Sequence, residues 1–329
     1  MVYLEHNTRI PLYEHEKDIT HFIWQLRRYG PIESQKKLRI IHNLGTDPVC
    51  LPLLLAGASV SGQGVLVELG TYVGLSSRCL AHGLGKAKAA INATSEMESS
   101  YHAFDVFGHD ARNFEKIGAR MPWVKEVDPN FSEDSSYRWL WDAAVKDVYP
   151  NAVGHEGLID ADSLYPKLWH KRPVQVLSVD SAKSWGAFRD QTAGIQKPYM
   201  LKRGALLILM DFATIDTQIK LLYSGCLRQY IQPVYSSFCQ GEQWIFVVTQ
   251  SFSLGMIGAC LEDYLDGNQV PTEAQFEAMM AQATEDVEFM DGLFGQTSPA
   301  MAKQRTCLLD KVREELNDAK VHWKYLQVQ

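Results

Sequence analysis

The 329-residue sequence lacks the features of several large classes of protein. Its six cysteines are scattered and include no Cys-x-x-Cys pair, which argues against a zinc cluster and against a framework of disulfide bonds. No run of lysine and arginine forms a basic patch and the net charge is −7, so we expect no nucleic-acid partner. The longest apolar run lies around residues 50–60 and falls short of the roughly 20 residues that cross a bilayer.

The sequence begins Met-Val-Tyr-Leu-Glu-His-Asn, without the charged-then-apolar pattern of a secretory signal. Together with the scattered cysteines, this predicts a protein of the reducing cytoplasm that does not associate with membranes. Apolar residues make up 46% of the chain and charged residues 22%. This is an ordinary globular composition, and it is sufficient to fill a sizeable core.

The most informative segment is 65–77, Val-Leu-Val-Glu-Leu-Gly-Thr-Tyr-Val-Gly-Leu-Ser-Ser. It predicts a buried strand, a tight turn bracketed by Gly70 and Gly74, and a helix whose first N–H groups are free. An acid, Glu68, stands two residues before the first glycine. The Gly-x-x-x-Gly spacing differs from the Gly-x-Gly-x-x-Gly motif of dinucleotide-binding proteins. A plainer interpretation is an ordinary strand-to-helix turn of an α/β protein.

From residue 65 onward, strand patterns alternate with helical ones. We expect strands at 65–69, 101–106, 154–160, 174–180, 205–210, 231–236 and 243–249, with the last two forming an antiparallel hairpin at the sheet edge. The first helix of this alternating region is expected from Leu75 to about Gly85. This alternation predicts an α/β fold with a doubly wound, mostly parallel seven-stranded sheet over a domain of 61–250. Helical spacing predicts an N-terminal helical cap over 1–60 and a C-terminal helical extension over 251–329.

The segment 109–150 interrupts this alternation and is rich in aromatic residues. A connection of this length is often functional, which predicts an aromatic lid over a substrate. An extra helix packed on the sheet is the alternative. Near the C-terminus, apolar residues from Leu309 to Leu326 recur with heptad spacing, over too few repeats for an independent coiled coil. We expect that helix to pack on its own domain or to join two copies as a homodimer.

Acidic residues stand at the ends of successive expected strands. They are Glu68, Asp105, Asp160 with Asp162, Asp180 and Asp211. Ligands of such sheets bind beyond the carboxyl ends of the strands, where the strand order reverses. A single acid at such a place is often a turn or helix-cap residue. A set of acids at successive strand ends predicts a binding site instead.

Residues 65–250 resemble the class I S-adenosylmethionine-dependent methyltransferases. The turn after the first strand is similar to their first motif, and Ala103-Phe-Asp-Val-Phe-Gly108 resembles their second motif, as found in the macrocin-type O-methyltransferases of antibiotic pathways. The resemblance implies S-adenosylmethionine as the cofactor. It also implies that Asp105 accepts hydrogen bonds from the ribose hydroxyls, as a carboxylate can.

The same resemblance implies the other contacts of the cofactor. Glu68 would lie near its amino group, the turn glycines would accommodate its methionine half, and Asp160 or Asp162 would face the adenine amine. The full set of cofactor-binding residues that it implies is Glu68, Gly70, Thr71, Tyr72, Gly74, Ser76, Asp105, Val106, Asp160, Asp162 and Asp180.

Val179-Asp-Ser-Ala-Lys-Ser-Trp185 resembles the Asp-x-x-Lys motif of the catechol-type, cation-dependent O-methyltransferases. The resemblance implies that Asp180 is a catalytic metal ligand and that Lys183 deprotonates the substrate hydroxyl, with a pKa lowered by burial or by a cation. Asp211 would be the second metal ligand. The acid or asparagine that both relatives pair with it is missing here, so the presence of Mg²⁺ stays open. Asp216 is a nearby substitute.

Histidines near the sheet, such as His109, are alternative bases for a metal-free enzyme, although a structural role is the simpler interpretation. Together these expectations describe an O-methyltransferase that acts on a small hydroxylated metabolite or natural product. Two alternatives stay open. In the first, the chain is a pseudoenzyme or scaffold subunit that binds the cofactor without methylating. In the second, it is an enzyme that uses the same fold for another reaction.

Overall fold

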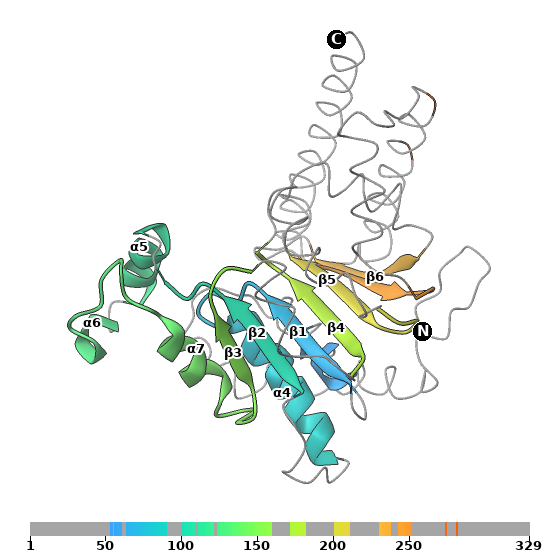
Figure 1. Ribbon diagram of the computed structural model, residues 1–329, viewed down its shortest axis with the longest axis horizontal. Helices are drawn as coiled ribbons and strands as arrows, with labels where there is room; N and C mark the ends of the chain where they lie inside the picture. Colours follow the sequence, from blue (N-terminus) through green and yellow to red (C-terminus); the bar gives the residue numbers. More distant parts are fainter. Residues whose placement is uncertain are drawn as a thin grey trace, which may run out of the picture. The chain divides into compact units, whose positions relative to one another are not determined.

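The structure is a computed structural model that describes residues 53–54, 56–60, 64–90, 100–108, 111–121, 124–159, 172–181, 201–210, 230–237 and 243–251, with single residues at 274 and 281. Seven strands form one sheet in the order β3-β2-β1-β4-β5-β7-β6 (Figure 1). The α/β class and the mixed, mostly parallel sheet agree with the prediction. Residues 1–159 with 170–178 form one unit, and residues 160–169 with 179–329 form a second.

Three strands of the first unit lie side by side and run parallel. They are β1 (Val65–Leu69), β2 (Tyr101–Asp105) and β3 (Val153–Glu156), and β4 (Val174–Val179) follows β1 on its other side. Every residue of β1 and β2 is buried. Both faces of these strands are therefore covered, which explains why β1 is a continuous apolar run interrupted only by Glu68.

The described part of this unit includes the helices α4 (Leu75–Ala90), α5 (Ala111–Arg120), α6 (Val124–Val127) and α7 (Arg138–Val145), and α7 contacts both α4 and β3. Helix α4 continues to Ala90, so its predicted end near Gly85 is wrong. Its glycines serve close packing instead. A Cβ atom at Gly83 would lie 1.9 Å from the carbonyl oxygen of Leu54, and one at Gly85 would lie 2.7 Å from that of Val148.

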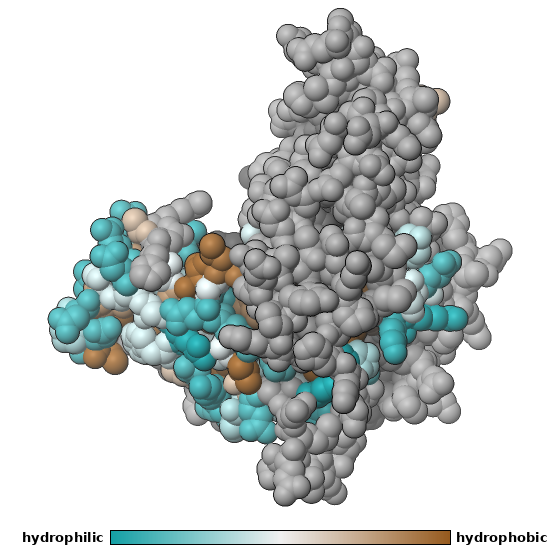
Figure 2. All heavy atoms as spheres, viewed as in Figure 1, coloured by the Kyte–Doolittle hydropathy of each residue, from teal (hydrophilic) through white to brown (hydrophobic). Residues whose placement is uncertain are grey.

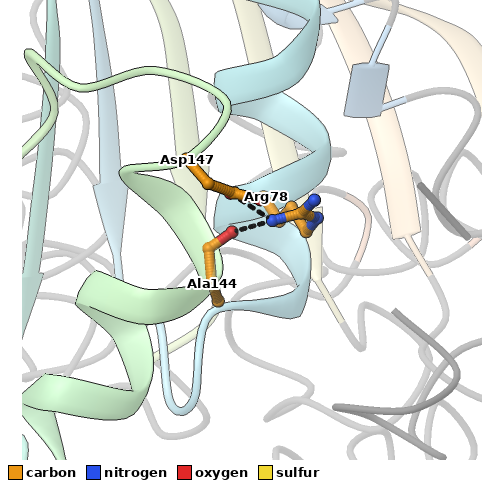
Figure 3. A network of polar contacts seen from close by, with 3 residues as sticks. All are labelled: Arg78, Ala144 and Asp147. Atoms are coloured by element: carbon orange, nitrogen blue, oxygen red, sulfur yellow. Dashed lines mark hydrogen bonds and ion pairs between the residues drawn. The ribbon is translucent and has the colours of Figure 1, made fainter. Parts of the chain in front are cut away.

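A buried arginine joins α4 to the end of α7 (Figure 3). Arg78 Nη1 donates a hydrogen bond of 2.5 Å to the carbonyl oxygen of Ala144 and pairs with Asp147. The Arg78 side chain is only 3% exposed. A cation at a helix C-terminus satisfies a carbonyl that has no partner within the helix and complements the helix dipole. Arg78 therefore fixes the C-terminal end of α7 on the core.

The segment 109–150 contains α5, α6 and α7. Trp141 of α7 is completely buried, and α7 packs on α4 and β3. This part of the segment corresponds to the extra helix packed on the sheet, which was one of the two sequence interpretations. Closure of the rest of the segment over a substrate stays a prediction.

The third strand is shorter than expected, because β3 ends at Glu156 rather than at Asp160. Gly157 follows with a φ of 139°, a conformation that suits glycine, and its N–H donates to the carbonyl oxygen of Asp105 at 3.0 Å. Leu158, which looked like part of the strand, is 73% exposed. The expected third strand over 154–160 is therefore corrected, and the end of β3 carries Glu156 instead of Asp160.

The second unit contains β5 (Leu206–Met210), β6 (Ile231–Ser237) and β7 (Gln243–Val248). β7 is antiparallel to both β5 and β6, which confirms the predicted hairpin. β6 stands at the end of the strand order and contains Pro233, beside an irregularity in the register. Proline fits an edge strand because it cannot donate to the ladder.

Hydrophilic side chains cover most of the described surface in the view of Figure 2, with a few separate hydrophobic patches. In the described part of the chain, no helix is long and apolar enough to cross a membrane. The N-terminal helical cap and the C-terminal helical extension fall almost entirely outside the described residues and stay predictions, as does the doubly wound arrangement.

Candidate functional site

The turn at 70–74 connects β1 to α4 at the carboxyl end of the sheet. β1 lies between β2 and β4, so the strand order reverses beside this turn. The backbone φ is positive at Gly70 (83°), Tyr72 (48°) and Gly74 (91°). Glycine adopts this conformation freely, whereas a residue as bulky as Tyr72 does so at a cost of about 1–3 kcal/mol.

Asp105, the last residue of β2, holds this turn in place. Its Oδ2 accepts hydrogen bonds from the backbone N–H groups of Thr71 at 2.7 Å and Tyr72 at 2.8 Å. Its Oδ1 accepts one from the N–H of Phe107 at 2.9 Å and one from the hydroxyl of Tyr137 at 3.1 Å. One carboxylate therefore joins the turn after β1, the loop after β2 and the residue that precedes α7.

The strained residues of this region are the ones that Asp105 binds. Among the described residues, Tyr72 and Phe107 (φ 51°) are the non-glycine residues with positive φ. The N–H groups of both donate to the Asp105 carboxylate. Hydrogen bonds to a charged group contribute about 1.5–3 kcal/mol each, which is enough to offset the strain. The carboxylate thus stabilises a loop geometry that the two side chains disfavour.

All the acceptor positions of Asp105 are in use. An ionised carboxylate offers about four of them, and the protein supplies four donors. Asp105 is 7% exposed. The ribose contact that the resemblance implies therefore requires one protein donor to leave or to share its position.

Tyr137 is the side-chain donor of this set, and sequence reasoning did not assign it to the site. Its ring meets those of Tyr72 and Phe107 edge-on, with centroids 5.8 and 6.0 Å away. Burial, and then the negative charge of Asp105, raise the pKa of Tyr137 well above its usual range. The hydroxyl therefore stays protonated near neutral pH and acts as a donor to Asp105. Its place in the aromatic segment was the one available signal.

Glu68 has a different environment, although it lies on the neighbouring strand. It is completely buried, and its Oε2 accepts hydrogen bonds from the hydroxyl of Ser77 at 2.5 Å and from that of Tyr101. Ser77 Oγ in turn accepts a hydrogen bond of 2.9 Å from Trp141 Nε1. Burial, and then the charge of Glu68, raise the pKa of Tyr101. This arrangement gives Glu68 a structural role, and its contact with the cofactor stays a prediction.

The other predicted turn residues differ in their exposure. Gly70, Tyr72 and Ser76 are half-buried, Thr71 is buried and Val106 is 36% exposed. Gly70, Tyr72, Ser76 and Val106 are therefore the members of this group that are accessible to a ligand.

Gly74 is required by packing as well as by its φ. A Cβ atom there would lie 3.1 Å from Trp141 Cδ1 and 3.2 Å from the Ala144 Cβ. Close approach of α7 is sufficient to explain this glycine, and its contact with the cofactor stays a prediction.

The predicted catalytic and metal residues are described only in part. Asp180 directly follows β4 and is half-buried. The remaining predicted residues lie outside the described part of the chain: Asp160, Asp162, Lys183, Asp211, Asp216 and His109. In the described part, no group of three or more His, Cys, Asp or Glu residues could hold a metal ion. The Mg²⁺ site therefore stays a prediction.

Two histidines pair across β2 and β3. His102 Nδ1 lies 3.3 Å from His155 Nε2, and the ring of His155 stacks on Phe104 with centroids 4.5 Å apart. His102 and His155 lie within their strands rather than at the carboxyl edge, and His102 is 8% exposed. Their contacts agree with a structural role.

No protein-family model and no curated protein matches the sequence. One similar solved structure is an apo TDP-rhamnose 3'-O-methyltransferase of calicheamicin biosynthesis, 15% identical over 61% of this chain and 79% of that chain, with a TM-score of 0.32. Another is a Streptococcus pneumoniae protein described as a candidate tRNA (m1A22) methyltransferase, 14% identical over 81% of this chain and 97% of that chain, with a TM-score of 0.29.

Both of these structures are named as methyltransferases, but the likenesses are too slight to support an argument about activity. The strand order itself is that of a mixed sheet with an antiparallel β7 inserted between β5 and β6. The fold assignment rests on that order.

Proposed function

We propose that the protein is an S-adenosylmethionine-dependent methyltransferase that acts on a hydroxyl group of a small metabolite or natural product. The observation that carries this proposal is the bonding of the Gly70–Gly74 turn to the acid at the end of β2. Two adjacent N–H groups of the turn donate to Asp105. This assembly stands where the strand order reverses, which is where such sheets bind nucleotide ligands.

The proposed cofactor contacts follow from which parts of this assembly are accessible. The partly exposed residues Gly70, Tyr72 and Ser76 would hold the methionine half. Val106 would contact the nucleoside, and Asp105 would bind the ribose hydroxyls once a protein donor has withdrawn. When bound, the cofactor supplies an electrophilic methyl group. Asp160 or Asp162 stays the proposed contact of the adenine amine.

The remaining task of the protein is to orient the acceptor oxygen and remove its proton. We propose that the amine of Lys183 accepts this proton. Asp180 and Asp211 would hold a divalent cation beside the acceptor if the enzyme uses one. The net charge of −7 favours a small-molecule substrate over nucleic acid.

We also propose a cytoplasmic homodimer joined through the terminal helices, which light scattering of the purified protein would test.

Calorimetric titration with S-adenosylhomocysteine, followed by methyl-transfer assays on a panel of hydroxylated compounds, tests the function. We expect binding in the micromolar range and product with at least one acceptor class. Lys183→Met should leave the affinity unchanged and lower turnover by about 10²- to 10⁴-fold. Lys202→Met, which removes an exposed lysine, is the matched control and should have no effect. Absence of binding at millimolar ligand would contradict the proposal.

A second candidate function has one observation in its favour. Because four protein donors occupy Asp105, the same fold is suited to a scaffold subunit that no longer binds the cofactor. The titration separates the two candidates. Measurable binding excludes a scaffold without cofactor, and binding without turnover on any acceptor leaves a cofactor-binding pseudoenzyme or another reaction on the same fold.

A further inference from the structure

The hydroxyl of Tyr137 occupies one of the acceptor positions of Asp105. We infer that Tyr137 is a positioning residue of the proposed cofactor site. Its hydroxyl holds Asp105 in the free protein and is displaced when the ribose binds. This inference rests on the proposed function. It adds a competitor for the carboxylate to a site that otherwise consists of the turn and the acid.

The four donors of Asp105 are not equally able to leave. Three are backbone N–H groups, from Thr71, Tyr72 and Phe107, and each is fixed by the path of its loop. Their withdrawal would leave strained backbone without its compensating bond. The Tyr137 hydroxyl is carried by a side chain, forms the longest of the four bonds at 3.1 Å, and can leave by rotation about side-chain torsions. It is therefore the donor that a ribose hydroxyl displaces.

Movement of the buried Tyr137 ring breaks its contacts with Tyr72 and Phe107 but does not require α7 to unfold. Tyr137 occupies the N-cap position of α7, but its side chain makes no capping hydrogen bond. The remainder of the helix is fixed by the burial of Trp141 and by the contact of Arg78 with Ala144. Displacement of the hydroxyl is thus confined to the residue that precedes the helix. Its other polar neighbour, Asn113 Nδ2, lies 3.5 Å away and forms at most a weak bond.

Tyr137→Phe tests the inference because it keeps the ring and deletes only the competing hydroxyl. We expect this variant to bind S-adenosylhomocysteine about tenfold more tightly than the wild type, since about 1.4 kcal/mol of hydrogen bonding no longer has to be broken. The 2′,3′-dideoxy analogue of S-adenosylhomocysteine cannot displace Tyr137, so its affinity should be the same in both proteins. Tyr101→Phe, which deletes the other tyrosine hydroxyl bound to a buried carboxylate, should change neither affinity.

The outcomes separate this inference from the function on which it rests. Equal or weaker binding of S-adenosylhomocysteine by Tyr137→Phe overturns the displacement while the proposed function stands. A gain in affinity that persists with the dideoxy analogue also overturns it, because the ribose hydroxyls would then not be the competitors. Absence of binding by the folded wild type overturns the proposed function and the inference together.

A second measurement on the unaltered protein guards against a variant that fails to fold. In tyrosine-labelled wild type, saturation with S-adenosylhomocysteine should shift the NMR resonances of the Tyr137 ring and leave those of Tyr101 in place. An unchanged Tyr137 signal at saturation would contradict displacement.

Discussion

Strands β1 and β2 lie side by side, and each carries a buried acid near its carboxyl end, but the two regions around these acids are built differently. Glu68 turns into the core, where the side-chain hydroxyls of Ser77 and Tyr101 donate to its Oε2. Asp105 turns toward the loops, where it collects three backbone N–H groups. Glu68 joins packed secondary-structure elements to each other, and Asp105 stabilises the conformation of the loops.

The difference shows why an acid at a strand end is ambiguous evidence of function. Both residues fit the same sequence pattern, and both are more than nine-tenths buried. Only the partners distinguish them. Backbone donors and strained loops surround Asp105, as is typical of a functional site, whereas Glu68 belongs to a hydrogen-bond chain that ends on Trp141. The comparison predicts that mutations near Asp105 change both stability and ligand binding, and that mutations of Glu68 change stability alone.

Replacement of Asp105 should have the largest effect. In Asp105→Ala, three backbone N–H groups lose their acceptor, and the positive φ of Tyr72 and Phe107 loses its compensation. We expect a loss of about 4 kcal/mol in the free energy of unfolding and loss of S-adenosylhomocysteine binding. Urea denaturation and calorimetry measure the two effects. A stable variant with wild-type affinity would remove Asp105 from the site and make it equivalent to Glu68.

Gly74→Ala should follow, because the added Cβ would meet Trp141 and Ala144 at a backbone φ of 91°. We expect a loss of about 2–3 kcal/mol in the free energy of unfolding. The matched control is Gly118→Ala in α5, where nothing lies within 4 Å of the added atom. That variant should gain about 0.5–1 kcal/mol from helix propensity alone.

The paired glycine variants also sharpen the comparison of the two regions. If Gly74 serves the packing of α7, ligand affinity in the folded fraction of Gly74→Ala should remain within a few-fold of the wild type. A stable Gly74→Ala protein that has lost binding would instead place Gly74 at the ligand.

Much of the fold was readable from local patterns. The bounds of β1 were predicted without error, because an apolar run is closed by Gly70, and those of β2, β4, β5, β6 and β7 match to within a residue. The exception is β3, where the apolar pattern continues past Gly157 although the strand does not. The end of α4 was missed for a related reason: Gly85 indicates a helix end locally, but it is a packing glycine in the folded protein.

The candidate site was less readable, because its contacts join distant segments. Asp105 and the turn glycines were found from the motif. The partners that give Asp105 its environment were not, since Thr71 and Tyr137 stand 34 and 32 residues away in the chain. No local spacing relates Tyr137 to Asp105, nor Trp141 to Ser77, which is 64 residues distant. The division between a structural acid and a site acid therefore emerges only from the tertiary structure.

Glu68→Gln should have a smaller effect than the Asp105 and Gly74 replacements. The amide keeps one oxygen for the hydroxyls of Ser77 and Tyr101, and these can reorient to accept from its N–H₂ group. We expect a loss of about 1–2 kcal/mol in the free energy of unfolding, with unchanged affinity for S-adenosylhomocysteine. Loss of binding in a folded Glu68→Gln protein would contradict the structural role and restore Glu68 as a cofactor contact.

The smallest expected effect is a dependence on alkaline pH that comes from Tyr101. Its pKa is raised in the folded state, first by burial and then by Glu68, so the hydroxyl stays protonated when the unfolded chain would already release its proton near pH 10. The folded state then holds more protons than the unfolded state, and stability falls as the pH rises. Between pH 9 and 11 the loss for one tyrosine is about 1.4 kcal/mol.

Tyr101→Phe removes this dependence, so the stability gap between wild type and variant should narrow by about 1.4 kcal/mol over the same range. The pKa of Lys88 is lowered by burial and then by Arg172. The stability that Lys88 contributes therefore rises with pH, whereas that of Tyr101 falls. Lys88 is present in both proteins and cancels from the difference. Urea denaturation at half-unit steps of pH measures the gap. If the free energies of unfolding of the two proteins changed in parallel with pH, the Tyr101 hydroxyl would not retain its proton beside Glu68. That result would contradict the hydrogen bond between them.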